Sequence, residues 1–289
     1  MDLNELIHKR LSSYEDLKGI LASFAGEPAI FNTEFPPDQS PGWEGKGQYP
    51  RICYKIDMQV NQERSSSGTL QIAVYSDKSG MLAEVIEGLV RERLKDILMK
   101  PEGQDPLCVA WASTAAYLLE GTAIVCKEIV FDILEYPNQE TTDPDPVIAV
   151  GTFIKELYPE SIVIGLDRLE DYTDPAEHPV FFCRLQSCEK TTGHCAHTIC
   201  WFNAKVAIHI LAPDASVRLK MASAINQKMA MDEEIIMLDQ SPMFISSQSL
   251  NNKADYLREG QLTVTGKYGC LRNNEKKHNL VGVSMGFVR

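Results

Sequence analysis

Long apolar runs are missing from the 289-residue sequence, and their absence argues against a membrane-spanning helix. A helix that crosses a bilayer needs about 20 consecutive apolar residues, and no run approaches that length. Residues 1–18 also lack the basic start, apolar centre and small-residue cleavage site of a secretory signal. With 44% hydrophobic and 24% charged residues, the composition is typical of a soluble protein with a sizeable core. We therefore expect a cytosolic protein with no membrane partner.

Basic charge is also scarce. The chain has 28 Lys and Arg against 40 Asp and Glu, which gives a net charge of −12. Because affinity for nucleic acid comes largely from basic side chains that neutralise phosphates, this balance argues against a surface that grips DNA or RNA. The eight cysteines, in a chain without a secretion signal, predict free thiols rather than a disulfide framework.

Catalytic signatures are absent from the sequence. It contains no Gly-x-Ser-x-Gly elbow, no phosphate-binding loop ending in Lys-Ser or Lys-Thr, no His-Glu-x-x-His pair and no dinucleotide fingerprint. His209 lies within the apolar run VAIHIL, where a histidine satisfied by hydrogen bonds is expected rather than a general base. We therefore expect no catalytic residues, no cofactor and no enzymatic activity.

One segment collects side chains of the kinds that bind metal. Cys188, His194, Cys195, His197 and Cys200 lie close together at a predicted hairpin tip, and thiolates and imidazoles suit zinc. The segment has no Cys-x-x-Cys knuckle, and adjacent side chains in a strand point to opposite faces. We interpret it as a solvated hairpin with free thiols, and keep a zinc-binding module centred on Cys188–Cys200 as the alternative from a different functional class.

An internal repeat is the most informative feature of the sequence. YPRICYKID at 49–57 resembles HPVFFCRLQ at 178–186, and TLQIAVYSD at 69–77 resembles KVAIHILAPD at 205–214. Amphipathic helices follow both pairs, and a strand introduced by Gly121 or Gly260 follows each helix. The helical pattern aligns Met81, Val85, Leu89 and Arg93 with Val217, Met221, Ile225 and Met229. Repeated order with drifting spacing predicts a tandem duplication.

The boundary between the copies lies in EYPNQETTDPDPV at 135–147. Three prolines lie there among acids and threonines, and Asp143 or Asp145 is placed to cap a helix that opens at Pro146. We predict a first repeat at 1–138, a linker at 139–145, a second repeat at 146–272 and a C-terminal strand or arm at 273–289. The acidic excess lies mainly in the first repeat.

Each predicted repeat has the order helix, strand, long loop, β-hairpin, helix, strand, strand. Alternating apolar and polar positions in the strands favour an antiparallel or mixed sheet with one covered face over a doubly wound parallel sheet. The predicted fold class is therefore α+β, with two tandem copies of a small sheet covered by helices on one face.

At this point the residues resemble a known family. The series YPRICYKI, TLQIAVYSD and AEVIEGLVRERL at 49–94 is similar to the tail-terminator, or tail-completion, proteins of tailed bacteriophages and prophages. Members of that family are commonly a single such unit, so the doubled length is a departure. The resemblance implies a non-enzymatic virion protein that is assembled in the bacterial cytoplasm and forms a ring at the neck of the particle.

The resemblance also implies the partners. These are other copies of the chain, the tail tube protein, the head-side connector and, as a further candidate, the tail sheath, with DNA passing through the lumen without specific binding. Six chains form the ring if the two repeats serve different neighbours, and three if each repeat fills one of six equivalent positions. The unequal charges of the repeats favour six. A different head–tail adaptor or a baseplate component is the alternative within the same class.

Residues for contacts with neighbours are predicted in two segments. Trp43 and Glu44 lie in the Pro/Gly-rich loop at 34–48, where an exposed aromatic side chain can anchor in a neighbour's pocket. Phe287 lies in the strand predicted at 280–289, which can add to a neighbour's sheet edge. The alternatives are that Trp43 packs its own loop down and that the C-terminal strand is an ordinary edge strand of its own domain.

Overall fold

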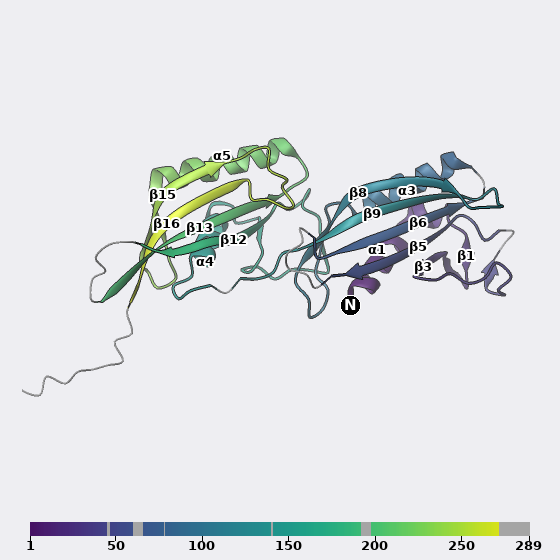
Figure 1. Cartoon of the computed structure of the whole chain (residues 1–289), viewed down its shortest axis with the longest axis horizontal. Helices are drawn as coiled ribbons and strands as arrows, with labels where there is room; N and C mark the ends of the chain where they lie inside the picture. The colour runs from purple at the N-terminus through teal and green to yellow at the C-terminus, as the bar shows by residue number, and fades with distance from the viewer. Residues whose placement is uncertain (45–46, 60–65, 78, 140, 192–197, 272–289) are drawn as a thin grey trace, which may run out of the picture.

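The computed structural model describes residues 1–44, 47–59, 66–77, 79–139, 141–191 and 198–271. The fold is mixed α+β, with two large sheets, a small third sheet and few helices, as Figure 1 shows. Within the described ranges, no helix has the length and apolar character needed to cross a membrane. Phe287 and the predicted C-terminal strand lie outside the described residues.

The first large sheet has the strand order β11-β7-β8-β9-β6-β5-β3. Only β3 and β5 pair in parallel, and the other neighbours are antiparallel. Its strands are β3 (Ile30–Asn32), β5 (Arg51–Met58), β6 (Gly68–Ser76), β7 (Leu98–Met99), β8 (Leu107–Leu118), β9 (Val125–Glu135) and β11 (Tyr172–Thr173). Its helices are α1 (Leu3–Ser12), α2 (Glu15–Lys18) and α3 (Gly80–Leu94).

The second large sheet has the order β10-β12-β13-β16-β15-β14, with only β10 and β12 in parallel. The elements are α4 (Pro146–Leu157), β10 (Ile162–Val163), β12 (Val180–Lys190), β13 (Ile199–Leu211), α5 (Ala215–Asp232), β14 (Glu234–Ile236), β15 (Pro242–Leu250) and β16 (Leu262–Leu271). This order matches that of β3-β5-β6-β9-β8-β7 in the first sheet position by position.

The third sheet is small and has the order β2-β1-β4. It is formed by β1 (Ser23–Phe24), β2 (Glu27–Pro28) and β4 (Trp43–Glu44). Both pairings are antiparallel. Because β4 lies in the loop between β3 and β5, its pairing with β1 attaches this loop to the segment that follows α2.

Side-chain caps explain where the main helices begin. Asp2 and Glu5 form a capping box at α1, and the Ser79 side chain accepts from the Leu82 amide at α3. Asp145 accepts from the Val147 and Ile148 amides, and Pro146 occupies the first turn of α4. The helix start predicted at Pro146 is therefore confirmed, with Asp145 rather than Asp143 as the cap.

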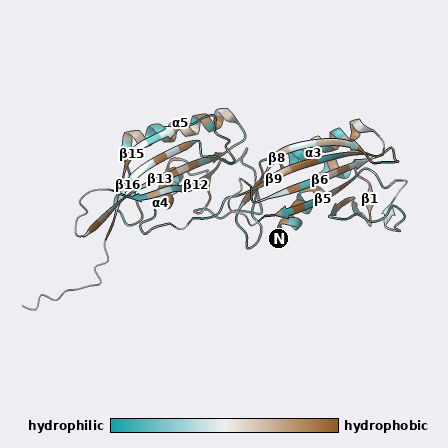
Figure 2. Ribbon diagram, in the orientation of Figure 1, coloured by the Kyte–Doolittle hydropathy of each residue, from teal (hydrophilic) through white to brown (hydrophobic). Residues whose placement is uncertain are grey.

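Each large sheet packs its alternate side chains against helices. Leu70, Ile72 and Val74 of β6 share a buried cluster with Ile86 and Val90 of α3. In the second sheet the corresponding cluster contains, from β13 and α5, Val206, Ile208, Ile210, Ile225 and Met229. Figure 2 shows apolar residues along the strands of both sheets. These two clusters form the main core.

The helix face marked by the aligned series that starts at Met81 is not the face of α3 that packs inward. Met81 is 77% exposed and Val85 is 49% exposed, whereas the face that packs inward is formed by Ala83, Ile86, Val90 and Leu94. Both the series Met81, Val85 and the series Ile86, Val90, Leu94 repeat every four residues, and the two series lie about 100° apart around the helix, so the spacing alone does not say which one packs inward. Val217, which the sequence alignment places with Met81, is exposed as well.

The predicted pairing of Gly121 with Gly260 is also wrong. Ile129 lies opposite Ile72 in the first sheet, and Leu262 lies opposite Ile208 in the second. Ile129 and Leu262 therefore hold equivalent positions. Gly260 precedes Leu262 by two residues, and the residue that precedes Ile129 by two lies within β9, so Gly260 is not equivalent to Gly121. The connection between β15 and β16 is longer than the one between β8 and β9, and this displaces the glycines.

Candidate functional site: the junction between the sheets and the surfaces around it

The two large sheets meet through a third apolar cluster, which we call the junction. Its members are Leu98, Cys108, Ala110, Leu134 and Tyr136 from the first half of the chain, and Ile164, Val180, Phe182, Leu211 and Leu257 from the second. In β12, Val180 and Phe182 alternate with Phe181 and Cys183, which face the core of their own sheet. The side chains of β12 that form the junction therefore lie on the face opposite to the one that packs in the core of the second sheet. Figure 1 shows the two sheets arranged end to end.

Polar contacts fix the position of the two halves at the junction. The Tyr256 hydroxyl donates to Asp96 Oδ2 at 2.6 Å, and the Tyr136 hydroxyl donates to the Leu257 carbonyl at 3.0 Å. Arg258 pairs with Asp132 across the same boundary. Burial raises the pKa of Tyr136 and of Tyr256, so both hydroxyls remain protonated donors.

A strand from the second half completes the first sheet. In β11, Tyr172 lies opposite Met99 and Thr173 lies opposite Leu98 of β7. The Tyr172 hydroxyl donates to the Leu6 carbonyl at 2.7 Å, and the Arg10 guanidinium lies 5.3 Å from the centre of its ring. Burial raises the pKa of Tyr172 to about 12. The second half thus inserts an aromatic side chain between the sheet edge and α1 of the first.

His209 lies beside the junction and is almost completely buried. Its ring is 5.5 Å from that of Phe182, and neither ring nitrogen has a hydrogen-bond partner within the described part of the chain. Burial lowers the pKa of His209 to about 4, so the imidazole is neutral at pH 7. The expectation that hydrogen bonds satisfy this histidine is therefore wrong among the described residues, because neither ring nitrogen reaches a partner there.

Trp43 packs against aromatic side chains of its own chain. Its ring is 5.0 Å from Phe24 and 5.8 Å from Phe31, and its Nε1 donates to the Pro37 carbonyl at 3.0 Å. Glu44 is exposed and accepts from the Ser23 hydroxyl. The intramolecular packing considered for Trp43 is thus present, and its predicted role and that of Glu44 in contacting a neighbour stay predictions.

A buried arginine organises the rest of this aromatic cluster. The Arg51 guanidinium lies 3.7 Å from the Phe35 ring and 4.3 Å from the Tyr49 ring, and it pairs with Asp38 at 2.7 Å. Arg51 is 3% exposed, whereas its partner Asp38 is about half exposed. The cluster packs the loop before β5 against the sheet.

The predicted metal ligands are only partly within the described residues. His194, Cys195 and His197 lie outside them. Cys188 Sγ lies 3.3 Å from the Tyr268 hydroxyl, and Cys200 is opposite Cys270 in the ladder between β13 and β16. Among the described residues, no group of three or more Cys, His, Asp or Glu is placed to hold a metal. The interpretation of this segment as a solvated hairpin with free thiols stays a prediction, and zinc binding stays its alternative.

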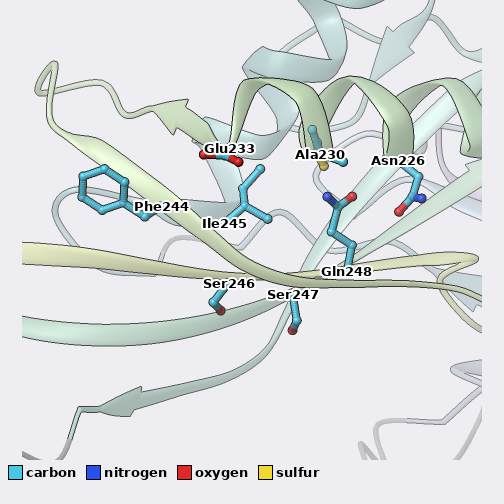
Figure 3. Close-up of a pocket in the computed structure, with 9 residues that line it drawn as sticks. Asn226, Ala230, Glu233, Phe244, Ile245, Ser246, Ser247 and Gln248 are labelled. Carbon is cyan, nitrogen blue, oxygen red and sulfur yellow. The ribbon is translucent and has the colours of Figure 1, made fainter.

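A pocket of about 650 Å³ lies between α5 and β15, and Figure 3 shows its lining. Gln248 points from β15 toward α5. With its amide nitrogen toward the helix, it lies 2.9 Å from Asn226 Oδ1 and its oxygen lies 3.1 Å from the Ala230 amide. The pocket is lined by Asn226, Met229, Ala230, Glu233, Phe244, Ile245, Ser246, Ser247 and Gln248.

The first sheet fills the place that corresponds to this pocket. Trp111 lies opposite Phe131 of β9, as Gln248 lies opposite Val264 of β16, and its ring packs 4.8 Å from the Arg91 guanidinium of α3. In the second sheet the smaller Gln248 takes the place of this tryptophan beside the pocket. Sequence reasoning did not identify it, although the aligned strands place Gln248 where the first half has a tryptophan.

Comparison with protein-family models and with curated proteins found no match. Among solved structures, one chain of "Virion of native gene transfer agent (GTA) particle" matches with a TM-score of 0.36 and 14% sequence identity. The match covers 46% of this chain and 92% of that chain. At this TM-score the match does not establish a shared fold.

Proposed function

We propose that the protein is a non-enzymatic structural component of a phage-like virion, and specifically a tail terminator that forms a ring at the neck. The motifs that resemble the tail-terminator family coincide with β5, β6 and α3, which are consecutive in the chain and packed around one core. None of the other sequence motifs considered above includes these residues.

We further propose that the chain arose by tandem duplication, with repeats at 1–138 and 146–272, a linker at 139–145 and an arm at 273–289. The ladders support this proposal. Ile56, Leu70 and Phe131 lie side by side across β5, β6 and β9. Leu185, Val206 and Val264 hold the same relation across β12, β13 and β16. Helices packed against each sheet complete the proposed repeat.

The observation that carries the proposed function is the junction. One half of the chain completes the sheet of the other half with β11 and buries ten residues of the apolar cluster between them. Such a contact joins different surfaces of two similar units, and heterologous contacts of this type close into rings when the rotation between units permits. A chain made of units joined in this way suits a ring.

The proposed partners follow from this role. They are other copies of the chain, the tail tube protein, the head-side connector and, as a further candidate, the tail sheath. A net charge of −12 allows DNA to pass a ring without phosphate-binding sites. Six chains are favoured over three, because the acidic first half and the second half present different surfaces to their neighbours.

Tube growth provides the test of this proposal. Purified tube protein polymerises with and without the chain, and the tubes are measured by negative-stain electron microscopy. We expect shorter tubes with added density at one end when the chain is present. Unchanged tube lengths with bare ends would contradict the terminator role, and binding to purified portal instead would indicate a head–tail adaptor.

A further inference from the structure

A groove at the end of the second sheet is the starting point, and we call it the end groove. It has a volume of about 460 Å³ and is lined by Phe153, Glu156, Leu157, Lys228, Asp232, Glu234 and Ile236 of α4, α5 and β14. β14 pairs with β15 on one side and is the outermost strand of its sheet as described. Ile236 is 51% exposed and Leu238, just beyond β14, is 62% exposed. An open strand edge and apolar side chains thus lie together.

The corresponding place in the first sheet is occupied. β7 holds the position in the first sheet that β14 holds in the second, and both directly follow the helices α3 and α5. There the outer edge of β7 pairs with β11, and Tyr172 packs against α1 beneath Arg10. The end groove is therefore the unfilled counterpart of a site that takes a short strand with one aromatic residue.

The chain contains a second segment of the same kind. Tyr172 precedes Pro179 by seven residues, and Trp43 precedes Pro50 by the same seven. Both segments form two-residue strands, β11 at Tyr172–Thr173 and β4 at Trp43–Glu44. β4 pairs with β1 on one side and is the outermost strand of its small sheet as described. In Figure 1, β1, which pairs with β4, and β15, which pairs with β14, lie near opposite ends of the chain.

We propose that β4 of one copy pairs antiparallel with β14 of a second copy, and that Trp43 covers the end groove of that copy. The proposal repeats the contact made inside the chain by β11 and β7. Edge strands that add to each other give main-chain hydrogen bonds, and an aromatic side chain in a groove gives specificity. Lys228, which lines the end groove and pairs with Asp232 at 2.6 Å, places a cation there, as Arg10 does beside Tyr172.

The register of the internal contact assigns the residues that face each other. Because Tyr172 faces Met99 and Thr173 faces Leu98, the equivalent pairs are Trp43 with Ile235 and Glu44 with Glu234. Two carboxylates that face each other across a strand pair repel. Substitution of Glu44 would therefore remove a repulsion from the proposed interface. A role of Glu44 confined to its own loop would not change association in this way.

This inference deepens the proposed function, because it specifies the surfaces through which copies would join in a ring. It also rests on the equivalence of the two halves argued there. Repetition of the contact from copy to copy gives a heterologous interface, which closes into a ring or extends into a filament according to the rotation between copies.

Sedimentation velocity over a range of concentrations tests the interface in the full chain. We expect concentration-dependent association of the unmodified chain, weakened by about tenfold or more in Trp43→Ala and in Ile236→Lys. Glu44→Lys is expected to strengthen association, because it removes the repulsion with Glu234. Leu118→Lys, at an exposed apolar residue on β8, is the matched control and should leave association unchanged.

Two outcomes of that experiment would overturn the inference. One is association that Ile236→Lys and Leu118→Lys affect equally, and the other is a weaker association of Glu44→Lys. Trp43 also packs on Phe24, so its variant alone is not decisive. Ile236 has half of its surface exposed, and its substitution keeps the experiment interpretable if the Trp43 variant fails to fold.

Intermolecular cross-linking tests the register directly. A chain carrying Glu44→Cys is mixed with a chain carrying Glu234→Cys under mild oxidation, and we expect a disulfide-linked dimer above the background of each chain alone. Glu27→Cys on β2 replaces Glu44→Cys in the control mixture. Equal yields in the two mixtures would overturn the inference.

The tube-growth assay separates the failure of this inference from the failure of the proposed function. A chain that shortens tubes but gives no specific cross-link would overturn the inference and leave the terminator role standing. A chain that cross-links as predicted but leaves tubes unchanged would support the inference and contradict that role.

Discussion

At the residue scale, His209 makes the stability of the folded chain depend on pH. Its pKa is about 4 in the folded chain and about 6.5 when exposed, so the unfolded chain binds a proton in a range where the folded chain does not. The sign follows: this contribution is fully present above about pH 6.5 and is lost as the pH falls toward 4. The loss amounts to about 3 kcal/mol.

Urea unfolding between pH 4 and 7.5 measures this effect. We expect the difference in free energy of unfolding between the unmodified chain and His209→Gln to change by about 3 kcal/mol over that range, in the direction of relative stabilisation of the variant at low pH. The exposed His178, changed to Gln, is the control and should leave the pH profile unchanged. A profile of His209→Gln parallel to that of the unmodified chain would show that His209 is not the titrating group.

A second prediction at this scale concerns the hydrogen bond across the junction. Asp96 is buried and its Oδ1 has no hydrogen-bond partner within the described chain, so the Tyr256 hydroxyl is an important donor for its carboxylate. Tyr256→Phe should lower the free energy of unfolding by about 1–3 kcal/mol. A double-mutant cycle with Asp96→Asn measures the coupling, and a coupling near zero would contradict the assigned contact.

At the element scale, α3 tests which helix face packs inward. Ile86 is completely buried against the first sheet, and Ile86→Ala should cost about 2–5 kcal/mol of stability. Met81 is mostly exposed on the same helix, and Met81→Ala should change stability by no more than about 0.5 kcal/mol. Thermal or urea unfolding measures the loss of stability in both variants. Similar losses would contradict the assignment of Ile86 to the packed face and of Met81 to the exposed face.

Elements with a strong local signal could be predicted from the sequence. Alternating apolar residues marked β5, β6, β12 and β13, and Asp145 with Pro146 marked the start of α4. The helix face was misplaced because the pattern of α3 admits two apolar series, and only packing against the sheet distinguishes Ile86 and Val90 from Met81 and Val85.

Elements that depend on distant partners could not be predicted. β11 and β4 have two residues each, too few for any periodicity, and they exist because β7 and β1 lie beside them. The pocket beside Gln248 has the same origin, since it depends on what faces a side chain across two elements. The apolar strand around His209 predicted a packed histidine, but its lack of hydrogen-bond partners among the described residues depends on the surroundings that tertiary structure gives it, Phe182 among them.

At the scale of the whole molecule, the chain has two unlike ends. One end carries the small sheet with Trp43 and the Arg51 cluster, and the other carries β14 and the end groove. Between them, the junction shows how an aromatic-bearing strand of one half fits the sheet edge of the other. If the two ends fit each other as we propose, they favour head-to-tail assembly, which is the type of contact that the proposed ring needs.

Native mass spectrometry of the full chain, alone and mixed with tail tube protein, tests the central claim most directly. The account predicts a closed assembly of six chains, or three, that also appears bound to tube protein, and the same spectrum reports any zinc held by the Cys188–Cys200 segment. A monomer whose mass is unaffected by tube protein would contradict the account.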